Sequence, residues 1–322
     1  MKIVDPKITV LMSAYNGEGY LKETIESILN QTFTDFEFLI IDDGSTDKTA
    51  NILKEYKNKD KRIKIVTNKK NLGLTRSLNK GLKFSKGEYI ARMDGDDVSC
   101  FQRLKKQLGF IKKNKCSVVG SWAALINQSG KIVGHNRKPN SYFFIKWGLL
   151  FGSNPFPHPS AFFKKEAILK VGGYNKKFDF SQDLDLWSRL SKRYKIGILE
   201  EKLIKLRLHK KAVSQKFNEK QVKNKIKVSK KNVESLLGKK LNIKEANIWT
   251  SLISRKKLKT KRDLLPAFLL LRKIYKKFIE KSKPSKKAIS LIKKDIFYKI
   301  LNLLNTNLKN RLGFRKKALK SQ

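Results

Sequence analysis

Three aspartates surround one glycine directly after a short apolar segment. Residues 89–93 are rich in strand-forming side chains, and Asp94, Asp96 and Asp97 follow them at once. Carboxylates this close repel one another, and a divalent cation would turn that repulsion into ligation. Alternate side chains at a strand end point the same way, so Asp94 and Asp96 can share one site. Because Mg²⁺ commonly binds one or two carboxylates together with substrate phosphates, the segment predicts a metal–diphosphate site.

The alternative for this segment is a solvated acidic turn that caps a helix beginning near Phe101. Two further strand-like segments, residues 8–13 and 36–41, bear on the choice because polar residues follow each of them. The carboxyl ends of parallel strands meet at one edge of a sheet, so the residues after all three segments are expected to converge, which favours the metal site. These residues include Ala14, Tyr15, Asp42, Asp43 and Ser45, beside Asp94 and Asp96.

Strand-like and helical segments alternate through the first third of the chain. The strand-like segments are residues 8–13, 36–41, 63–66 and 89–93, and apolar residues at helical spacing lie between them. The repeat of about 25–30 residues is typical of parallel βαβ units. The near-continuous apolar strands indicate a sheet that is covered on both faces. The sequence therefore predicts an α/β fold whose ligand site lies at the carboxyl edge of the strands.

The pattern is less regular after residue 97. We expect helices at 101–113, 165–171 and 182–193, strands at 117–122, 161–163, 195–199 and 203–208, and a hairpin or loop at 130–139. Residues 156–160 contain two prolines, which predict a rigid, extended segment. Beyond residue 210 the pattern is helical and rich in lysine.

The composition is that of a globular chain with an extreme positive charge. The 322 residues are 40% hydrophobic and carry a formal net charge of +47, of which residues 210–322 hold +29, from 35 cations and six acids. Such a tail predicts an anionic partner, namely a membrane surface, a nucleic acid or an acidic polymer. No apolar run is long enough for a spanning helix, and no leader is recognisable. Cys100 and Cys116 predict neither disulfides nor a zinc site, so we expect a cytoplasmic protein.

Two stretches of the tail, residues 264–279 and 296–304, place apolar residues at helical spacing with lysines between them. This pattern suits a helix that lies among lipid headgroups, peripherally on the inner face of the cell membrane. The alternative is a small helical bundle packed on the preceding part of the chain with a solvated basic exterior, and both can hold. The charge also suggests a nucleic-acid-binding protein as a rival class. No nucleic-acid motif is recognisable, and the acids gather where a polyanion would be repelled, so no nucleic acid partner is expected.

Taken in order, the motifs over residues 6–215 resemble the inverting family 2 glycosyltransferases of the GT-A fold. The resemblance rests on Ser-Ala-Tyr-Asn at 13–16, Ser-Ile-Leu-Asn-Gln-Thr at 27–32, Ile-Asp-Asp-Gly-Ser-Thr-Asp at 41–47, Asn-Leu-Gly-Leu at 71–74, residues 91–97, His-Pro-Ser at 158–160, Gln-Asp at 182–183 and Arg-Leu-His at 207–209. It implies a Rossmann-like mixed sheet with helices on both faces in residues 1–215, with nucleotide-sugar binding in 1–97 and the acceptor side in 98–215. Residues 216–322 would form a basic, mainly helical C-terminal region.

The resemblance also implies roles for individual residues. Nucleotide-sugar binding falls to Ala14, Tyr15, Asp42, Asp43, Ser45, Arg76 and Asp94. A divalent metal, Mg²⁺ or Mn²⁺, falls to Asp96 and His209, and the catalytic base to Asp183. The acceptor side receives His158 and Gln182, the latter at a position where the family often has Glu. Each role has a structural alternative, such as a helix cap for Asp43, a packed ring for Tyr15, a surface cation for Arg76 and a helix N-terminal acid for Asp183.

The activity implied by the resemblance is hexosyl transfer with inversion. The expected donor is a nucleotide-diphosphate sugar, for which the resemblance favours the UDP form, and the expected acceptor is a hydroxyl of a cell-surface glycan or lipid-linked oligosaccharide. A GDP- or dTDP-sugar donor with another acceptor is the alternative within the same class.

Overall fold

The computed structural model describes residues 5–209, 218–254, 256–258 and 260–318. The chain forms two compact units. The first is built from Met1–Tyr142 and Asn154–Phe217, and the second from Phe143–Ser153 and Asn218–Gln322. The expected boundary at residues 215–216 lies outside the described residues.

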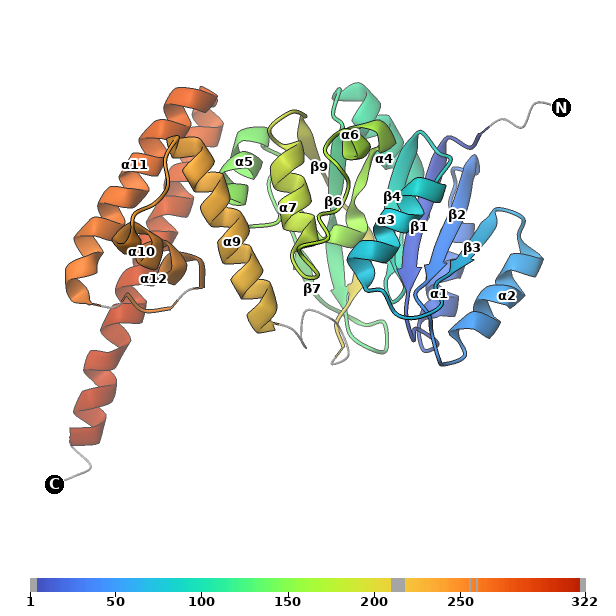
Figure 1. Ribbon diagram of the computed structural model, residues 1–322, viewed down its shortest axis with the longest axis horizontal. Helices are drawn as coiled ribbons and strands as arrows, with labels where there is room; N and C mark the ends of the chain where they lie inside the picture. The colour runs from blue at the N-terminus through green and yellow to red at the C-terminus, as the bar shows by residue number, and fades with distance from the viewer. Residues whose placement is uncertain (1–4, 210–217, 255, 259, 319–322) are drawn as a thin grey trace. The chain divides into compact units, whose positions relative to one another are not determined.

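A mixed nine-stranded sheet forms the centre of the first unit (Figure 1). The strand order is β3-β2-β1-β4-β8-β6-β9-β5, and β7 pairs with β6. The four strands predicted from the first third of the sequence all form, and they pair in parallel, as expected for βαβ units. The strands are β1 (Ile8–Ala14), β2 (Phe36–Asp42), β3 (Ile63–Thr67), β4 (Tyr89–Asp94), β5 (Val98–Ser99), β6 (Val118–Ile126), β7 (Ile132–Asn136), β8 (Phe162–Lys164) and β9 (Ile196–Arg207).

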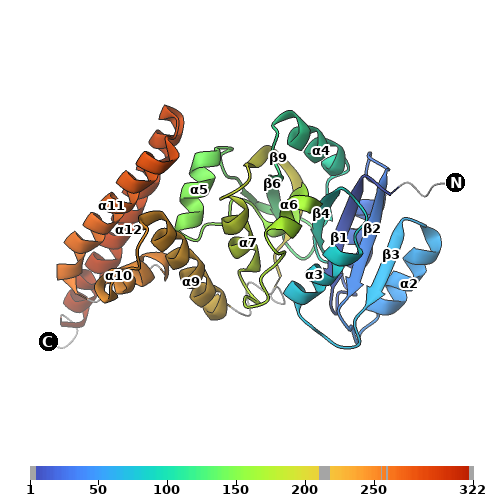
Figure 2. The ribbon, with the colours of Figure 1, turned by 45° about the horizontal axis from the view of Figure 1, so that its top comes forward.

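Helices cover both faces of this sheet, which confirms the predicted fold class (Figures 1 and 2). Val10 and Met12 of β1 belong to one core with α1, α2 and α4. Leu11 points to the opposite face, where α3 lies so close that a Cβ at Gly81 would come within 2.2 Å of the Leu11 side chain. The helices of this unit are α1 (Leu21–Leu29), α2 (Thr49–Lys59), α3 (Leu74–Phe84), α4 (Arg103–Lys113), α6 (Lys165–Lys170) and α7 (Gln182–Leu190).

The two strands expected at 195–199 and 203–208 are one strand, β9. Its parallel pairing with β6 shifts register, since Ser121 lies opposite Leu199 while the next residue, Trp122, lies opposite Lys202. Residues 200–201 are therefore extra residues of a β-bulge, which bends the strand without ending it. The exposed, charged sequence at the bulge resembled a turn and caused the wrong prediction.

The proline-containing segment 156–160 is not extended throughout. His158–Ser160 forms a 3₁₀ helix, in which Ala161 N donates to His158 O at 3.0 Å. Proline fixes φ near −65°, a value that suits this helix as well as an extended chain. The prolines therefore predicted the rigidity of the segment but not its shape.

The second unit is a helical bundle that includes a helix from the middle of the sequence. Helix α5 (Tyr142–Leu150) brings Trp147 into this core, where its indole nitrogen donates to Asp295 Oδ2 at 2.7 Å. The Phe151 ring lies 4.8 Å from the Trp147 ring and 5.0 Å from the Trp249 ring, measured between centroids. The other helices are α9 (Asn218–Leu237), α10 (Ile243–Ser254), α11 (Leu264–Ser282) and α12 (Lys286–Ala318).

Among the described residues, no helix has both the length and the apolar composition needed to cross a membrane.

A glycine after β2 holds the loop against another part of the backbone. Gly44 has φ +74°, and a Cβ there would lie 2.6 Å from the carbonyl carbon of Lys70. Gly44→Ala should therefore lower the free energy of unfolding by more than about 2 kcal/mol. Gly109→Ala, inside α4 with no atom within 4 Å of the added Cβ, should raise it by about 0.5–1 kcal/mol. Urea unfolding measures both, and a Gly44→Ala protein as stable as wild type would contradict the described loop.

Candidate active site

Strand pairing places the predicted polar clusters along one edge of the sheet. Ala14 at the end of β1 lies opposite Asp42 at the end of β2, and Ser13 lies opposite Asp94 at the end of β4. The residues that follow these strands therefore share the carboxyl edge, where α/β folds bind ligands. Tyr15, the first residue after β1, is 48% exposed at this edge.

The loops after β1 and β2 are joined by short hydrogen bonds. Asn16 has φ +48° and donates its backbone N–H to Ser45 Oγ at 3.1 Å. Its own Oδ1 accepts from Thr46 N at 2.8 Å. Ser45 thus braces the loop that carries Tyr15, whichever ligand that loop contacts.

The two adjacent aspartates after β2 have different surroundings. Asp43 accepts three hydrogen bonds, from Asn68 Nδ2 at 2.8 Å, Leu72 N at 2.9 Å and Gly73 N at 2.9 Å. These bonds hold the loop before α3. Among the described residues, the Asp42 carboxylate accepts only from Ser45 N, at 3.1 Å. Of the two carboxylates, Asp42 retains more capacity to accept from a ligand.

Arg76 lies exposed in the first turn of α3. Its Nη1 lies 3.4 Å from Leu72 O, a long contact that leaves most of the guanidinium donors to solvent or to a ligand.

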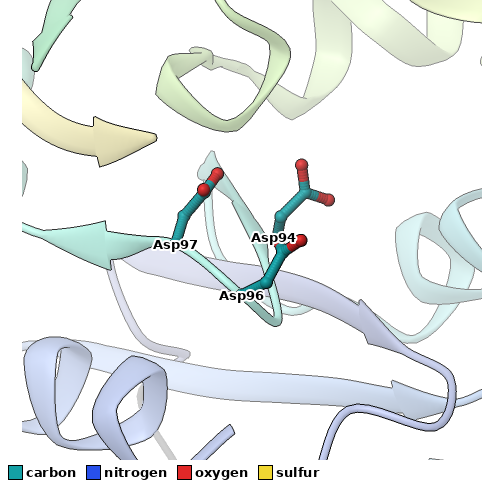
Figure 3. Close-up of side chains that lie close together, drawn as sticks. All are labelled: Asp94, Asp96 and Asp97. Atoms are coloured by element: carbon teal, nitrogen blue, oxygen red, sulfur yellow. The ribbon is translucent and has the colours of Figure 1, made fainter. Parts of the chain in front are cut away.

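Three carboxylates meet in the turn after β4. One oxygen from each of Asp94, Asp96 and Asp97 lies within 4.8 Å of the others (Figure 3). Asp97 is 1% exposed, and its Oδ1 accepts from Arg207 N at 2.8 Å. Its Oδ2 is buried and has no hydrogen-bond partner among the described residues. Burial raises the pKa of Asp97 well above its usual range, and the charges of Asp94 and Asp96 raise it further.

A buried arginine lies against the first of these acids. Arg92, two residues earlier on β4, is 2% exposed and forms an ion pair with Asp94 Oδ1. Its Nε and Nη1 are buried without a hydrogen-bond partner in the described part of the chain. Burial raises the pKa of Asp94, and the charge of Arg92 opposes this shift only in part.

A second buried arginine hydrogen-bonds to the backbone of the acidic turn. At the end of β9, Arg207 donates from Nε to Asp96 O and from Nη1 to Gln128 O, both at 3.0 Å. It pairs with Glu23, and its guanidinium carbon lies 4.5 Å from the centroid of the Tyr20 ring. Arg207 therefore ties the acidic turn to α1 and to β9.

His209 follows two residues later, and its Nε2 lies 2.8 Å from Asp96 Oδ2. Its ring also packs on Tyr20, with 5.4 Å between the centroids. The structure thus brings together the two residues that the sequence assigned to the metal.

Asp183 lies in the first turn of α7, after Ser181 in the left-handed region at φ +63°. Its Oδ2 accepts from Asn154 Nδ2 at 2.7 Å, while Asn154 Oδ1 is buried with no partner among the described residues. Burial raises the pKa of Asp183. The charge of Asp183 also contributes to the raised pKa of Asp94.

The remaining acceptor-side residues pack around the same cluster. The His158 ring nitrogen Nε2 lies 2.8 Å from the Tyr174 hydroxyl. Burial, with the nearby charge of Arg92, lowers the pKa of His158 well below its usual range, which keeps the ring neutral. Gln182 is buried at the start of α7. Helix α3 holds this segment in place, because Asn79 hydrogen-bonds the backbone of Tyr174 in both directions.

The donor set of the acidic turn fits a divalent cation. Carboxylate oxygens with one imidazole suit Mg²⁺ or Mn²⁺. The buried Oδ2 of Asp97 has no hydrogen-bond partner among the described residues, so it is available to bind an ion. Asp94, Asp96 and Asp97 with His209 are the side chains that could hold the ion.

The sequence predicts no role for several residues that the structure places at this site. Arg92 and Arg207 lay inside recognised motifs, so their positions were visible but their contacts were not. Asn154 and Tyr174 lay in segments without a motif, and only the folded chain brings them to the cluster. Buried polar groups of this kind leave no periodic signal in a sequence.

The comparisons with known proteins agree with this fold. The model of the family described as Glycosyl transferase family 2 matches residues 9–172. The O-antigen biosynthesis glycosyltransferase WbnJ of Escherichia coli is 38% identical over 217 residues, which are 66% of this chain and 83% of that protein.

Two solved structures share the fold. Staphylococcus aureus TarS 1-349 in complex with UDP-GlcNAc aligns with a TM-score of 0.60 and 17% identity, over 95% of this chain and 92% of that chain. The mannosyltransferase PcManGT of Pyrobaculum calidifontis, in complex with GDP-Man and Mn²⁺, aligns with a TM-score of 0.57 and 14% identity, over 96% of this chain and 88% of that chain.

Replacing the buried Arg92 by a neutral side chain should destabilise the fold to an extent that depends on pH. Arg92→Met should lower the free energy of unfolding at neutral pH by about 3 kcal/mol, because it leaves the Asp94 side chain, which is only 29% exposed, without its counter-ion. The pKa of Asp94 then rises further, so the folded variant binds protons that the unfolded chain does not, and the deficit should shrink as pH falls below neutral. Urea unfolding over a pH series measures this.

Two controls accompany that series. Arg92→Lys keeps the positive charge, so its free energy of unfolding should fall less than that of Arg92→Met. Lys106→Met removes an exposed pair with Glu201 and should change stability by no more than about 0.5 kcal/mol. A deficit for Arg92→Met that does not depend on pH would show that Arg92 contributes packing alone.

Proposed function

The chain belongs to glycosyl transferase family 2, and from this premise we propose that it transfers a sugar from a UDP-sugar to a hydroxyl group with inversion. The observation that carries the proposal is the meeting of Asp94, Asp96 and Asp97 at the strand ends, within electrostatic range of Asp183. The solved structures support a nucleotide-sugar donor, since TarS binds UDP-GlcNAc and PcManGT binds GDP-Man. A GDP- or dTDP-sugar remains the alternative donor.

The nucleotide would lie along the ends of β1 and β2. Asp42 has a carboxylate oxygen to accept from the base or ribose, while Asp43 fixes the loop before α3. Ala14 and the exposed ring of Tyr15 lie at the same edge, and Ser45 holds that loop. Arg76 could donate to a phosphate oxygen.

The diphosphate would lie over the acidic turn. Asp96, Asp97 and His209 would hold a divalent cation there, with Asp94 supporting the ribose or the ion. When bound, the cation supplies neutralisation of the charge that develops on the departing diphosphate. Arg207 keeps the turn and His209 in register for this task. The Mn²⁺ in the PcManGT complex supports this assignment.

Asp183 would act as general base. In a single displacement, its carboxylate takes the proton from the acceptor hydroxyl as that oxygen attacks the anomeric carbon and the bond to the diphosphate breaks. The amide of Asn154 orients the carboxylate, and its unpaired Oδ1 could accept from another acceptor hydroxyl. His158 and Gln182 would shape the acceptor side without ionising.

The acceptor would be a cell-surface glycan or lipid-linked oligosaccharide. The relative WbnJ is named for O-antigen biosynthesis, which supports a surface polysaccharide as the product. The charge of +29 on residues 210–322 supports peripheral attachment to the inner face of the membrane, where such acceptors would be reached.

A thermal-shift panel tests the donor and the metal. UDP-, GDP- and dTDP-sugars are compared with and without Mn²⁺, and a ligand that binds only the folded chain raises its melting temperature. We expect selective stabilisation by a UDP-sugar that is larger with the metal. Asp96→Asn should abolish the metal-dependent part, while the surface control Glu55→Gln should retain it. An unchanged shift in Asp96→Asn would remove Asp96 from the metal.

Kinetics as a function of pH test the base. Asp183→Asn should lower kcat by about 100- to 10,000-fold without weakening donor binding. Asn154→Ala removes a hydrogen bond that lowers the pKa of Asp183, so that pKa rises. Because the base must be ionised, the acid limb of the kcat profile should move to higher pH. Asn114→Ala, at the end of α4, is the control, and a limb that stays in place or moves to lower pH would contradict the assignment.

A further inference from the structure

Helix α11 has an apolar outer face in addition to the face that it buries. Its inner residues belong to the core of the second unit and are Ala267, Leu270, Leu271, Ile274 and Phe278. Leu265, Phe268 and Leu269 point outward, with 67%, 48% and 50% of their surfaces exposed. Further along the same face, Arg272 and Lys276 are exposed at helical spacing. The outer face therefore changes from apolar to cationic along the helix.

The start of α10 carries another exposed apolar side chain. Ile243 is 84% exposed and lies on a mostly apolar hollow of about 360 Å³, which Ile248 and Leu258 also line. Asp263, the residue before α11, lines the same hollow. We call Leu265, Phe268 and Leu269 the α11 surface (Figure 1 shows α10 and α11).

Cations are frequent in the segment that precedes α11. Residues 254–263, which join α10 to α11, contain six Lys or Arg residues and one acid. Lys256, Lys257 and Arg262 are exposed, while Leu258 between them is buried in the core and fixes the segment there. The connecting segment thus adds exposed positive charge to that of Arg272 and Lys276 on α11.

We propose that the α11 surface docks on an anionic lipid bilayer, with its apolar side chains among the lipid chains and the cations of α11 and the connecting segment among the headgroups. This arrangement is that of an interfacial amphipathic helix. The proposal rests on the peripheral membrane attachment proposed above and names the surface that makes it. It does not depend on the glycosyl transfer reaction, and vesicle binding tests it separately.

Charge complementarity favours a bilayer over other occupants. A nucleic acid would pair with the cations but would leave Leu265 and Leu269 in contact with water. A second copy of the chain would bring another +29 from residues 210–322 toward the first. An anionic bilayer satisfies both the apolar side chains and the charges.

The experiment is flotation of the full chain with lipid vesicles in EDTA. Vesicles of phosphatidylcholine are compared with vesicles that also contain phosphatidylglycerol, at about 0.1 M and about 0.5 M NaCl. The test variant is Leu265→Ser/Phe268→Ser/Leu269→Ser, which leaves the net charge unchanged. The matched control is Phe84→Ser/Ile132→Ser/Val133→Ser, which removes three exposed apolar side chains from the first unit. Circular dichroism confirms that both are folded.

We expect wild type and the control to bind the anionic vesicles, less at high salt, and the test variant to bind at least about tenfold more weakly. If wild type fails to bind anionic vesicles at low salt, both the attachment and the surface are wrong. If the test variant binds as wild type does, the attachment is by diffuse charge and the surface is wrong. A wild-type dimer that becomes a monomer in the test variant, with equal vesicle binding, would likewise overturn the proposal.

Discussion

Mutual repulsion among carboxylates is the constraint on which the site depends. Asp94, Asp96 and Asp97 lie close together, and Asp183 adds its charge to the same region. The protein offsets this repulsion only in part, since burial still raises the pKa of Asp94 and Asp97 and one oxygen of Asp97 has no partner among the described residues. A cation bound there would relieve repulsion that the fold leaves uncompensated, so ligand binding and stability are coupled at this edge of the sheet.

Two buried arginines contact these acids, each from a different strand. Arg92 lies on the strand that delivers them and contacts Asp94. Arg207 comes from the end of β9, far away in sequence, and contacts Asp96 and Asp97 through backbone and side-chain atoms. Because each buried charge is costly unless it is paired, the positions of β4 and β9 are tied to each other through the turn between them. With the bulge, the single strand β9 pairs with both β6 and β5 and also reaches this turn.

The sequence predicted what periodicity and strand-end chemistry control. The parallel strands β1 to β4 and the meeting of Asp42 with Ala14 followed from short apolar segments and from the rule that parallel strand ends share an edge. The contacts of Asp43 could not be predicted, because they depend on how the loop before α3 packs. Asn154 reaches Asp183 only through tertiary structure, and the bulge in β9 imitates a loop in the sequence.

The C-terminal region shows why apolar spacing alone does not distinguish a core from a surface. Leu265, Phe268 and Leu269 stand in the same apolar segment of α11 as Leu270 and Leu271, yet the first three are exposed and the last two are buried. A helix that is apolar on two sides can pack in a bundle and still offer a second face to another partner. Packing in the bundle and docking on a membrane are therefore compatible. The spacing of apolar residues in α11 fits both, because the helix has one buried and one exposed apolar face.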